Sequence, residues 1–219
     1  MTRARAANLL LVACSLASMP ALAAGPVRYE FDPVHTRVMM AIDHAGFSKA
    51  IGTISGSQGS LLFDPQDWSS ARMEVTVPMD KLDFGDSSWS AAVFAPRFLH
   101  VKRYPHARFV ADEVTRTDGD RGRACGKLTL HGTTRPLCMD LVLNKIARYP
   151  LPPFRRTIGF SATAQLKRSE FGMTSWRSLV GDEVELRIEA ELFQRGSETT
   201  RSQADAGDDA TPLDTDTDD

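Results

Sequence analysis

The sequence predicts an all-β domain, either an antiparallel barrel or a sandwich, with one short helix inserted between its strands. The first observation behind this prediction is that apolar residues recur at every second position, as they do on half-buried strands. The second is that Asp-Pro, Asp-Gly and His-Gly pairs separate these runs at short intervals. The third is length, because residues 24–194 suffice for one domain with a sizeable core.

The N-terminus, residues 1–23, has the features of a secretory signal peptide. Arg3 and Arg5 precede an apolar stretch that is too short to span a membrane, and an Ala-Leu-Ala triplet ends at Ala23. We therefore expect export from the cytoplasm, with cleavage after Ala23. The alternative is lipidation of Cys14, which would anchor the chain to a membrane. We prefer the site at Ala23 because apolar residues continue beyond Cys14.

Five runs of alternating apolar and polar residues predict strands in the folded part of the chain. In chain order they lie around residues 38–42, 61–63, 72–77, 158–167 and 183–192. The last run is the clearest, because its five apolar residues alternate with charged residues throughout. Each run therefore has one face for the interior and one for solvent.

A helix is predicted between the third and fourth of these runs. Asp86 or Ser87 can cap its N-terminus, Trp89 lies in its first turns, and Pro96 prevents its continuation. A second turn is compatible with residues 97–99. A helix in this position could close one end of a barrel.

A tight hairpin is predicted around His131 and Gly132. If these two residues form the centre of the turn, Cys125 faces Cys138 across the strands. Both this pair and Pro136 then occupy non-hydrogen-bonded positions, which suits a proline and brings the two cysteine Cβ atoms close. In an oxidising compartment we expect a structural disulfide between Cys125 and Cys138, since a redox-active pair would need a C-x-x-C spacing.

The C-terminal segment, residues 195–219, is predicted to be a disordered acidic tail. It contains eight acidic residues and only one large apolar residue, Leu213, so it cannot bury enough apolar surface to offset ordering. The whole chain is nearly neutral, with 26 basic and 28 acidic residues. Without a cluster of Lys and Arg on a recognisable motif, nucleic-acid binding is not expected.

Catalytic motifs are not found in the sequence, and we do not expect an enzyme. It lacks the G-x-S-x-G elbow, a phosphate-binding glycine loop and H-E-x-x-H. The five histidines show no paired spacing typical of metal ligands, so no metal site is predicted. The serines have no histidine or acid at a spacing that suggests a triad.

The interior of the predicted barrel is the remaining candidate for a functional site. A small barrel either fills its interior with side chains or leaves a cavity for one ligand. The inward faces combine large residues with small ones such as Ala162 and Ala190, although packed barrels also show this mixture. Our candidate lining residues are Val38, Met40, Ile42, Phe63, Val75, Phe109, Leu128, Leu141, Phe160, Ala162, Leu186 and Ile188. In a packed barrel the same residues would form an ordinary core.

Several collinear segments resemble the YceI-like proteins. Residues 32–36 read DPVHT and residues 44–48 read HAGFS. The most specific matches are LTLHGTTRP at residues 128–136 and KRSEFGM at residues 167–173. Together the matches extend over about residues 29–193.

The resemblance implies an extended, eight-stranded antiparallel barrel that is lipocalin-like and periplasmic. It also implies a non-covalently bound isoprenoid-type lipid: a polyisoprenoid, an isoprenoid quinone or another fatty amphiphile. No further cofactor is expected. A carrier of quinones would make transient contact with a membrane or a membrane protein. The sequence leaves the identity of the lipid open, because residues 86–90 depart from the family's mixture of charges near the pore. It leaves the oligomeric state open as well.

A second function stays open at this stage. If the barrel is packed shut, the domain would work through its surface as a periplasmic interaction or stress-response protein. The two functions differ in whether the purified protein contains a lipid.

Overall fold

The structure is a computed structural model that describes residues 25–195. The predicted signal peptide lies outside the described residues, as does the predicted acidic tail beyond its first residue. The strands are β1 (Val27–Phe31), β2 (Arg37–His44), β3 (Ser48–Ile54), β4 (Gln58–Phe63), β5 (Arg72–Pro78), β6 (His106–Asp118), β7 (Arg121–Leu130), β8 (Thr133–Arg148), β9 (Arg156–Lys167) and β10 (Val180–Gln194). The helices are α1 (Ser87–Phe94) and three short 3₁₀ helices, η1 (Trp68–Ser70), η2 (Met79–Lys81) and η3 (Arg168–Phe171).

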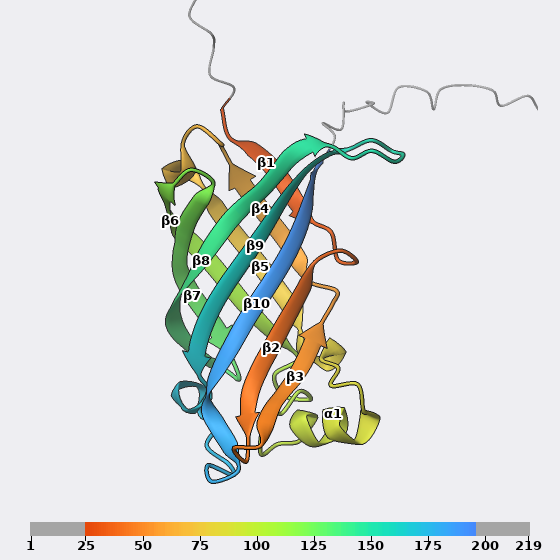
Figure 1. Cartoon of the computed structure of the whole chain (residues 1–219), viewed down its shortest axis with the longest axis vertical. Helices are drawn as coiled ribbons and strands as arrows, with labels where there is room; N and C mark the ends of the chain where they lie inside the picture. Colours follow the sequence, from red (N-terminus) through yellow and green to blue (C-terminus); the bar gives the residue numbers. More distant parts are fainter. Residues whose placement is uncertain (1–24, 196–219) are drawn as a thin grey trace, which may run out of the picture.

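Eight strands close into an antiparallel barrel, as the resemblance implies (Figure 1). Their order is β1-β4-β5-β6-β7-β8-β9-β10, and β10 pairs with β1 to complete the ring. This closure excludes the sandwich. A ring of strands leaves no long free edge, which removes a route to edge-to-edge aggregation.

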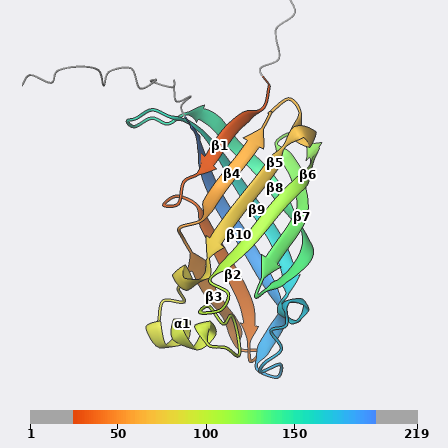
Figure 2. The ribbon, with the colours of Figure 1, turned by 180° about the vertical axis from the view of Figure 1, so that it is seen from behind.

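The β2–β3 hairpin extends the barrel wall at one end (Figure 2). β10 is long enough to pair with β1 near its C-terminus and with β2 nearer its start, for example Leu192 with Phe31 and Ile188 with Val38. β1 and β2 therefore follow one another along the same edge of β10. The alternation of apolar residues in the sequence located β2. It did not indicate that β1 and β2 share one edge of β10.

The break between β1 and β2 is produced by Asp32. Its carboxylate accepts hydrogen bonds from the backbone N–H groups of Val34 (2.8 Å) and His35 (3.1 Å). The Thr36 hydroxyl then donates to the Glu191 carbonyl at 3.1 Å, which fixes the start of the next strand against β10. The DPVHT segment is thus a turn in which the Asp32 carboxylate accepts the backbone hydrogen bonds that a partner strand would otherwise accept.

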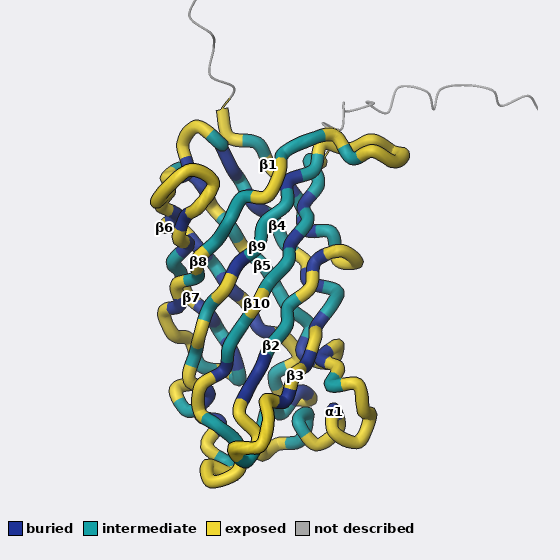
Figure 3. Tube along the Cα trace, in the orientation of Figure 1, coloured by how far each residue is buried: buried dark blue, intermediate teal, exposed yellow. Residues whose placement is uncertain are grey.

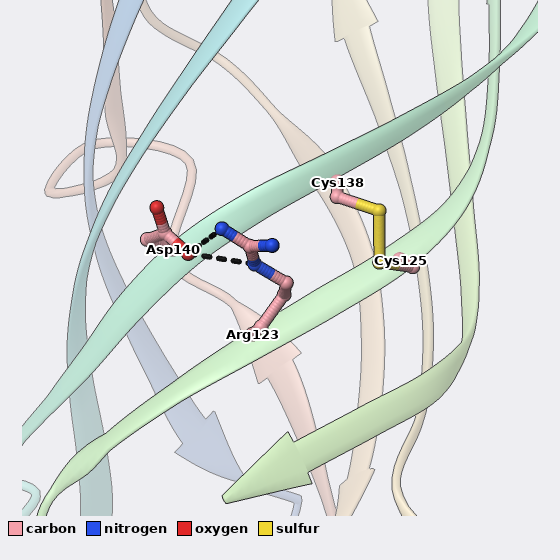
Figure 4. The surroundings of a disulfide bond; sticks show 4 residues. All are labelled: Arg123, Cys125, Cys138 and Asp140. Atoms are coloured by element: carbon pink, nitrogen blue, oxygen red, sulfur yellow. Dashed lines mark hydrogen bonds and ion pairs between the residues drawn. A yellow bond between two sulfur atoms is a disulfide. The ribbon is translucent and has the colours of Figure 1, made fainter. Parts of the chain in front are cut away.

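The predicted hairpin and disulfide are both present. Residues 131 and 132 form the turn with φ of 49° and 74°, and Cys125 pairs with Cys138. The two cysteines are bonded, with a Cα–Cα distance of 4.0 Å. Figure 4 shows the bridge next to the ion pair of Arg123 with Asp140, which spans the same two strands at 2.8 Å.

The predicted helix is also present, as α1. The Asp86 carboxylate accepts a hydrogen bond from the Trp89 N–H at 2.8 Å, so the aspartate is the N-cap. The helix ends at Phe94, before Pro96. In Figure 1 α1 lies beside the β2–β3 hairpin, at the end of the barrel opposite to β1.

Buried and exposed positions alternate along the strands, which places a main apolar core inside the barrel and a smaller cluster of Ile42, Ala50 and Val184 near the β2–β3 hairpin (Figure 3). Ile158 and Leu192, on the neighbouring strands β9 and β10, are at most 1% exposed. Within residues 25–195, none of the helices has the length and apolar character needed to cross a membrane.

Candidate functional site

The barrel interior contains two apolar cavities that meet end to end. The first, here called the closed-end cavity, has a volume of about 200 Å³ and lies towards β1 and η1. The second, the mouth cavity, has a volume of about 260 Å³ and lies towards α1. Six residues line both cavities: Val38, Ile54, Met79, Leu130, Leu166 and Leu186. The two cavities therefore adjoin along the barrel axis, and together we call them the elongated space.

The closed-end cavity is lined by apolar side chains except for Thr36 and Ser57. The Thr36 hydroxyl is already engaged with a backbone carbonyl. None of the lining residues carries an ionisable group. A surface of this composition can bind hydrocarbon, but it offers little to a charged or strongly polar molecule.

The far end of this cavity is closed by Trp68 from η1. The indole is 3% exposed and packs edge-on against the ring of Phe63, with 5.4 Å between ring centroids. Phe63 in turn packs edge-on against Phe160 at 5.6 Å. Gly122 makes room for the indole, because a Cβ atom at that position would lie 2.4 Å from the Trp68 ring. A larger residue there would displace the tryptophan.

The mouth cavity reaches the surface. Its lining includes Asp43 and His44 at the end of β2, Trp89 on α1 and Trp176 in the β9–β10 connection, all of which are exposed. By contrast, no lining residue of the closed-end cavity is exposed. The Trp89 ring stacks on Phe84 at 5.5 Å between centroids. The mouth cavity thus reaches the surface between α1, the β2–β3 turn and the β9–β10 connection, whereas the lining of the closed-end cavity stays buried or half-buried.

The inward residues also show that the barrel is hollow. Val75, Leu141 and Ile188 face the closed-end cavity, yet they are only partly buried. In a filled interior such residues would be in contact on all sides. Part of their accessible surface therefore borders the internal space.

All twelve residues predicted from strand alternation line this space. Ten of them line the closed-end cavity: Val38, Phe63, Val75, Phe109, Leu128, Leu141, Phe160, Ala162, Leu186 and Ile188. Met40 and Ile42 line the mouth cavity alone. Their contact with a ligand is a separate question, which we treat as a proposal below.

Sequence reasoning missed several lining residues. Leu61, Met73 and Val77 share an inward face with predicted residues on the same strands, so strict use of the alternation would have found them. Trp68 and Trp176 lie in connections, where no periodicity indicates direction. Nothing in the local sequence could have assigned those two tryptophans to the interior.

The KRSEFGM segment fixes the β9–β10 connection at the mouth. The Arg168 guanidinium is buried and donates to the backbone carbonyls of Met173 (2.7 Å), Val180 (2.9 Å) and Gly181 (2.7 Å). Burial lowers the pKa of this guanidinium, whereas the nearby carboxylate of Asp182 raises it. The arginine therefore holds the connection in place through three carbonyls rather than binding a ligand.

The LTLHGTTRP segment joins the β7–β8 turn to the same region. The His131 Nδ1 atom lies 2.9 Å from the Phe171 carbonyl oxygen, and its ring packs on Tyr104 at 4.7 Å between centroids. Gly132 is required beneath Tyr104, because a Cβ atom there would lie 2.6 Å from the tyrosine ring. The LTLHGTTRP and KRSEFGM segments, both of which resemble the YceI-like proteins, thus contact each other near the mouth.

No group of three or more His, Cys, Asp or Glu residues within positions 25–195 is placed to hold one metal ion. The disulfide lies on the outer face of the wall, where Cys138 is exposed, so it does not contact the cavity. Within residues 25–195, the apolar interior is consequently the candidate binding site that the sequence pattern and the structure both indicate.

A closed antiparallel barrel with an apolar interior open at one end defines a lipocalin-like class of protein. Within that class, the chain belongs to the YceI-like family, because the family model described as "YceI-like domain" matches residues 29–192.

Curated relatives cover most of the chain. A UPF0312 protein of Enterobacter sp. (strain 638) is 29% identical over 163 residues, which are 74% of this chain and 83% of the relative. The protein YceI of Salmonella arizonae is 29% identical over 161 residues, again 74% of this chain and 83% of the relative.

Solved structures show the same fold. BcnA of Burkholderia cenocepacia has a TM-score of 0.65 at 22% identity, covering 74% of this chain and 98% of BcnA. A domain of Saccharophagus degradans, described as a polyisoprenoid binding domain implicated in plant cell wall breakdown, has a TM-score of 0.60 at 10% identity. That alignment covers 77% of this chain and 99% of the domain.

Proposed function

We propose that this protein binds one long isoprenoid-type lipid inside its barrel, as a periplasmic carrier or reservoir and not as an enzyme. The observation that carries the proposal is the elongated apolar space that reaches the surface at the mouth. The ligand class comprises polyisoprenoids, isoprenoid quinones and other fatty amphiphiles. All twelve lining residues named above would contact its chain.

Simple energetics favour a long chain over a short one. Each buried methylene contributes about 0.8 kcal/mol. Association costs on the order of 4–15 kcal/mol in lost freedom. A chain of about five carbons contributes about 4 kcal/mol and barely offsets that cost, whereas about twenty carbons contribute about 16 kcal/mol. An apolar tube therefore discriminates by length.

The polar head of the lipid would sit at the mouth. Asp43 and His44 are the exposed polar residues that line the mouth cavity, and they can offer hydrogen bonds there. The closed end, beneath Trp68, would receive the tail. This orientation leaves no polar atom of the lipid in contact with the apolar lining.

Three further findings support the proposal. The domain of Saccharophagus degradans with the same fold is described as polyisoprenoid binding. The chain belongs to the family whose resemblance suggested this ligand class. The interior that would hold the lipid carries no ionisable group at its closed end, where catalysis by general acid and base would need one.

The test is mass spectrometry of organic extracts from the protein purified after export with its native signal. A stoichiometric long-chain lipid supports the proposal. Extracts without lipid, from protein that also takes up no added isoprenoid, would reject it and favour the alternative of a surface-acting interaction or stress-response protein.

A substitution within the cavity gives the first specific prediction. Ala162 is inward and buried on β9, so Ala162→Trp places an indole inside the tube and should abolish lipid co-purification while the barrel stays folded. The matched control is Thr163→Trp, because Thr163 is the next residue on the same strand and is exposed. Equal lipid content in the two variants, measured by extraction and with circular dichroism to verify folding, would contradict our placement of the ligand.

A further inference from the structure

We propose that the mouth of the barrel docks on the surface of a phospholipid bilayer. The inference concerns a surface rather than the interior. The biological purpose of docking rests on the proposed function, because a lipid that leaves the mouth would then enter the bilayer directly. The docking itself does not depend on that function.

Large apolar side chains surround the mouth and point to solvent. We call the following four residues the mouth rim: Phe47, 93% exposed, Trp89, 38%, Trp176, 54%, and Leu179, 48%. They come from the β2–β3 turn, α1 and the β9–β10 connection, which lie at the same end of the barrel (Figures 1 and 2). Exposed apolar residues that cluster in this way mark an interaction site.

Direct contacts hold the three segments of the rim together. The Ala45 N–H, in the turn that carries Phe47, donates to the Leu179 carbonyl at 2.6 Å. The Leu179 N–H donates to the Trp176 carbonyl at 3.0 Å. The His44 ring packs against Trp89 with 5.6 Å between centroids. The rim is therefore a preformed surface, and docking would need little ordering of side chains or loops.

The composition of the rim fits a bilayer interface. Tryptophan is enriched where hydrocarbon meets head groups, phenylalanine and leucine occur with it on the apolar faces of interface-bound segments, and cations beside them are attracted to anionic lipids. The Arg97 guanidinium lies over the Trp176 ring, 5.4 Å from its centroid, and Arg177 follows directly in the chain. Neither arginine forms an ion pair within 4.0 Å among residues 25–195.

Three acidic residues of this end accept hydrogen bonds from neighbouring groups. The Asp43 carboxylate accepts from the Gly46 N–H at 3.0 Å, and Asp86 caps α1. The Asp182 carboxylate accepts from Ser169. These acids balance part of the positive charge, so we expect docking to depend mainly on the aromatic residues and less on anionic lipid.

The opposite end of the barrel exposes apolar side chains but has no exposed residue that lines the apolar space. Its β8–β9 connection also exposes Leu151 and Phe154. However, Trp68 closes the interior at that end, and no lining residue there reaches solvent. Among residues 25–195, the mouth combines exposed aromatic residues with exposed residues that line the apolar space. The β8–β9 connection therefore provides a matched control for the loss of exposed apolar area.

The test is flotation of the exported protein with vesicles of phosphatidylethanolamine and phosphatidylglycerol in a three-to-one ratio. Phe47→Ser combined with Trp176→Ser should lower partitioning about tenfold or more, because two aromatic contacts with the interface are lost. Leu151→Ser combined with Phe154→Ser should leave partitioning unchanged. Arg97→Ala should lower it about fivefold on these vesicles and leave it unchanged on vesicles of phosphatidylcholine.

Fluorescence gives an independent measurement of which end inserts. The chain has three tryptophans, so Trp68→Phe leaves only Trp89 and Trp176, both on the rim. Vesicles that contain brominated lipids should quench this variant. Absence of wild-type flotation, equal flotation of the two serine variants, or absence of quenching would each overturn the proposal. So would a dimer in sedimentation that the Phe47→Ser, Trp176→Ser variant abolishes, since the rim would then be covered by a second copy.

Lipid content separates this inference from the proposed function. If Phe47→Ser protein, whose altered residue lines neither cavity, retains its extracted lipid but floats less than wild type, both proposals stand. If wild-type protein neither contains lipid nor takes up added isoprenoid and still floats, docking stands and the proposed function fails.

Discussion

At the scale of single residues, Asp32 and His35 show how one turn links two strands. The His35 Nδ1 atom lies 2.9 Å from a carboxylate oxygen of Asp32. This hydrogen bond and the charge of Asp32 raise the pKa of His35. Burial opposes ionisation of Asp32, but its hydrogen bonds with His35 and two backbone N–H groups lower its pKa overall. The pair is therefore most stable with both groups charged.

This pair gives a pH prediction. Because the pKa of His35 is raised on folding, its contribution to stability is complete below the ordinary histidine value of about 6.5 and is lost as pH rises through the folded value. Asp32→Asn should lower the pKa of His35 towards about 6.5, as measured by NMR titration of the ring. Asp140→Asn, at the ion pair on β8, is the control. A His35 pKa that stays the same in both variants would refute the assignment.

The effect of this pair on global stability should be small. The side chains of His35 and Asp32 are 50% and 26% exposed, so solvent screens their attraction. The turn instead depends on the backbone hydrogen bonds that the Asp32 carboxylate accepts.

At the scale of elements, the β7–β8 hairpin shows how far local pairing rules extend. A two-residue turn at His131 and Gly132 fixes the register of every pair up to Arg121 with Val142. The disulfide follows from this register, and its sulfur atoms lie outside the barrel wall. Ala124 and Met139, the neighbours of the two cysteines, face the cavity instead.

The position of the bridge predicts a change in stability without a change in binding. Replacing both Cys125 and Cys138 by serine should lower the free energy of unfolding by about 2–3 kcal/mol, because the cross-link no longer restricts the unfolded chain. Lipid content should stay the same. Denaturant unfolding and organic extraction measure the two quantities. Arg123→Ala, which removes the exposed ion pair beside the bridge, should cost less than about 1 kcal/mol. Loss of lipid from a folded serine variant would assign the bridge more than a stabilising role.

At the scale of the whole molecule, a hollow barrel lacks the contacts that a filled core would supply. Each unfilled region of the interior forgoes dispersion contacts between side chains. A ligand that fills the space should therefore stabilise the fold by linkage, in proportion to its occupancy.

This gives the last prediction. Removal of the lipid by organic exchange and refolding should lower Tm by several degrees, and addition of a long-chain isoprenoid should restore it. A short prenyl alcohol of about five carbons should restore much less, because it buries fewer methylenes. Scanning calorimetry measures all three states. Equal Tm values with and without lipid would show that a bound lipid does not stabilise the fold.

The elements could be predicted from sequence wherever neighbours along the chain decide the structure. Alternation on β9 and β10 fixed which faces turn inward, because successive side chains of a strand point to opposite sides. Asp86 and Pro96 fixed both ends of α1, since capping and the missing proline N–H act locally. The hairpin register fixed the disulfide for the same reason.

The candidate site could be predicted only in part. The sequence determined the twelve lining residues on strands, because their direction depends on period alone. It could not place Trp68 at the closed end or Trp89 and Trp176 at the mouth, because these depend on how connections fold over a finished barrel.

The amino-acid sequence by itself thus determined five strands with their inward faces (β2, β4, β5, β9 and β10), the β7–β8 hairpin with its disulfide, and the short helix, but not β1, β3 or β6. The tertiary structure alone decided that β1 closes on β10, that the interior stays hollow, and where it opens. Closure joins residues as distant as Tyr29 and Gln194, and local preferences carry no information about such pairings. The free space inside depends on the curvature and stagger of all eight strands together, which no single segment specifies.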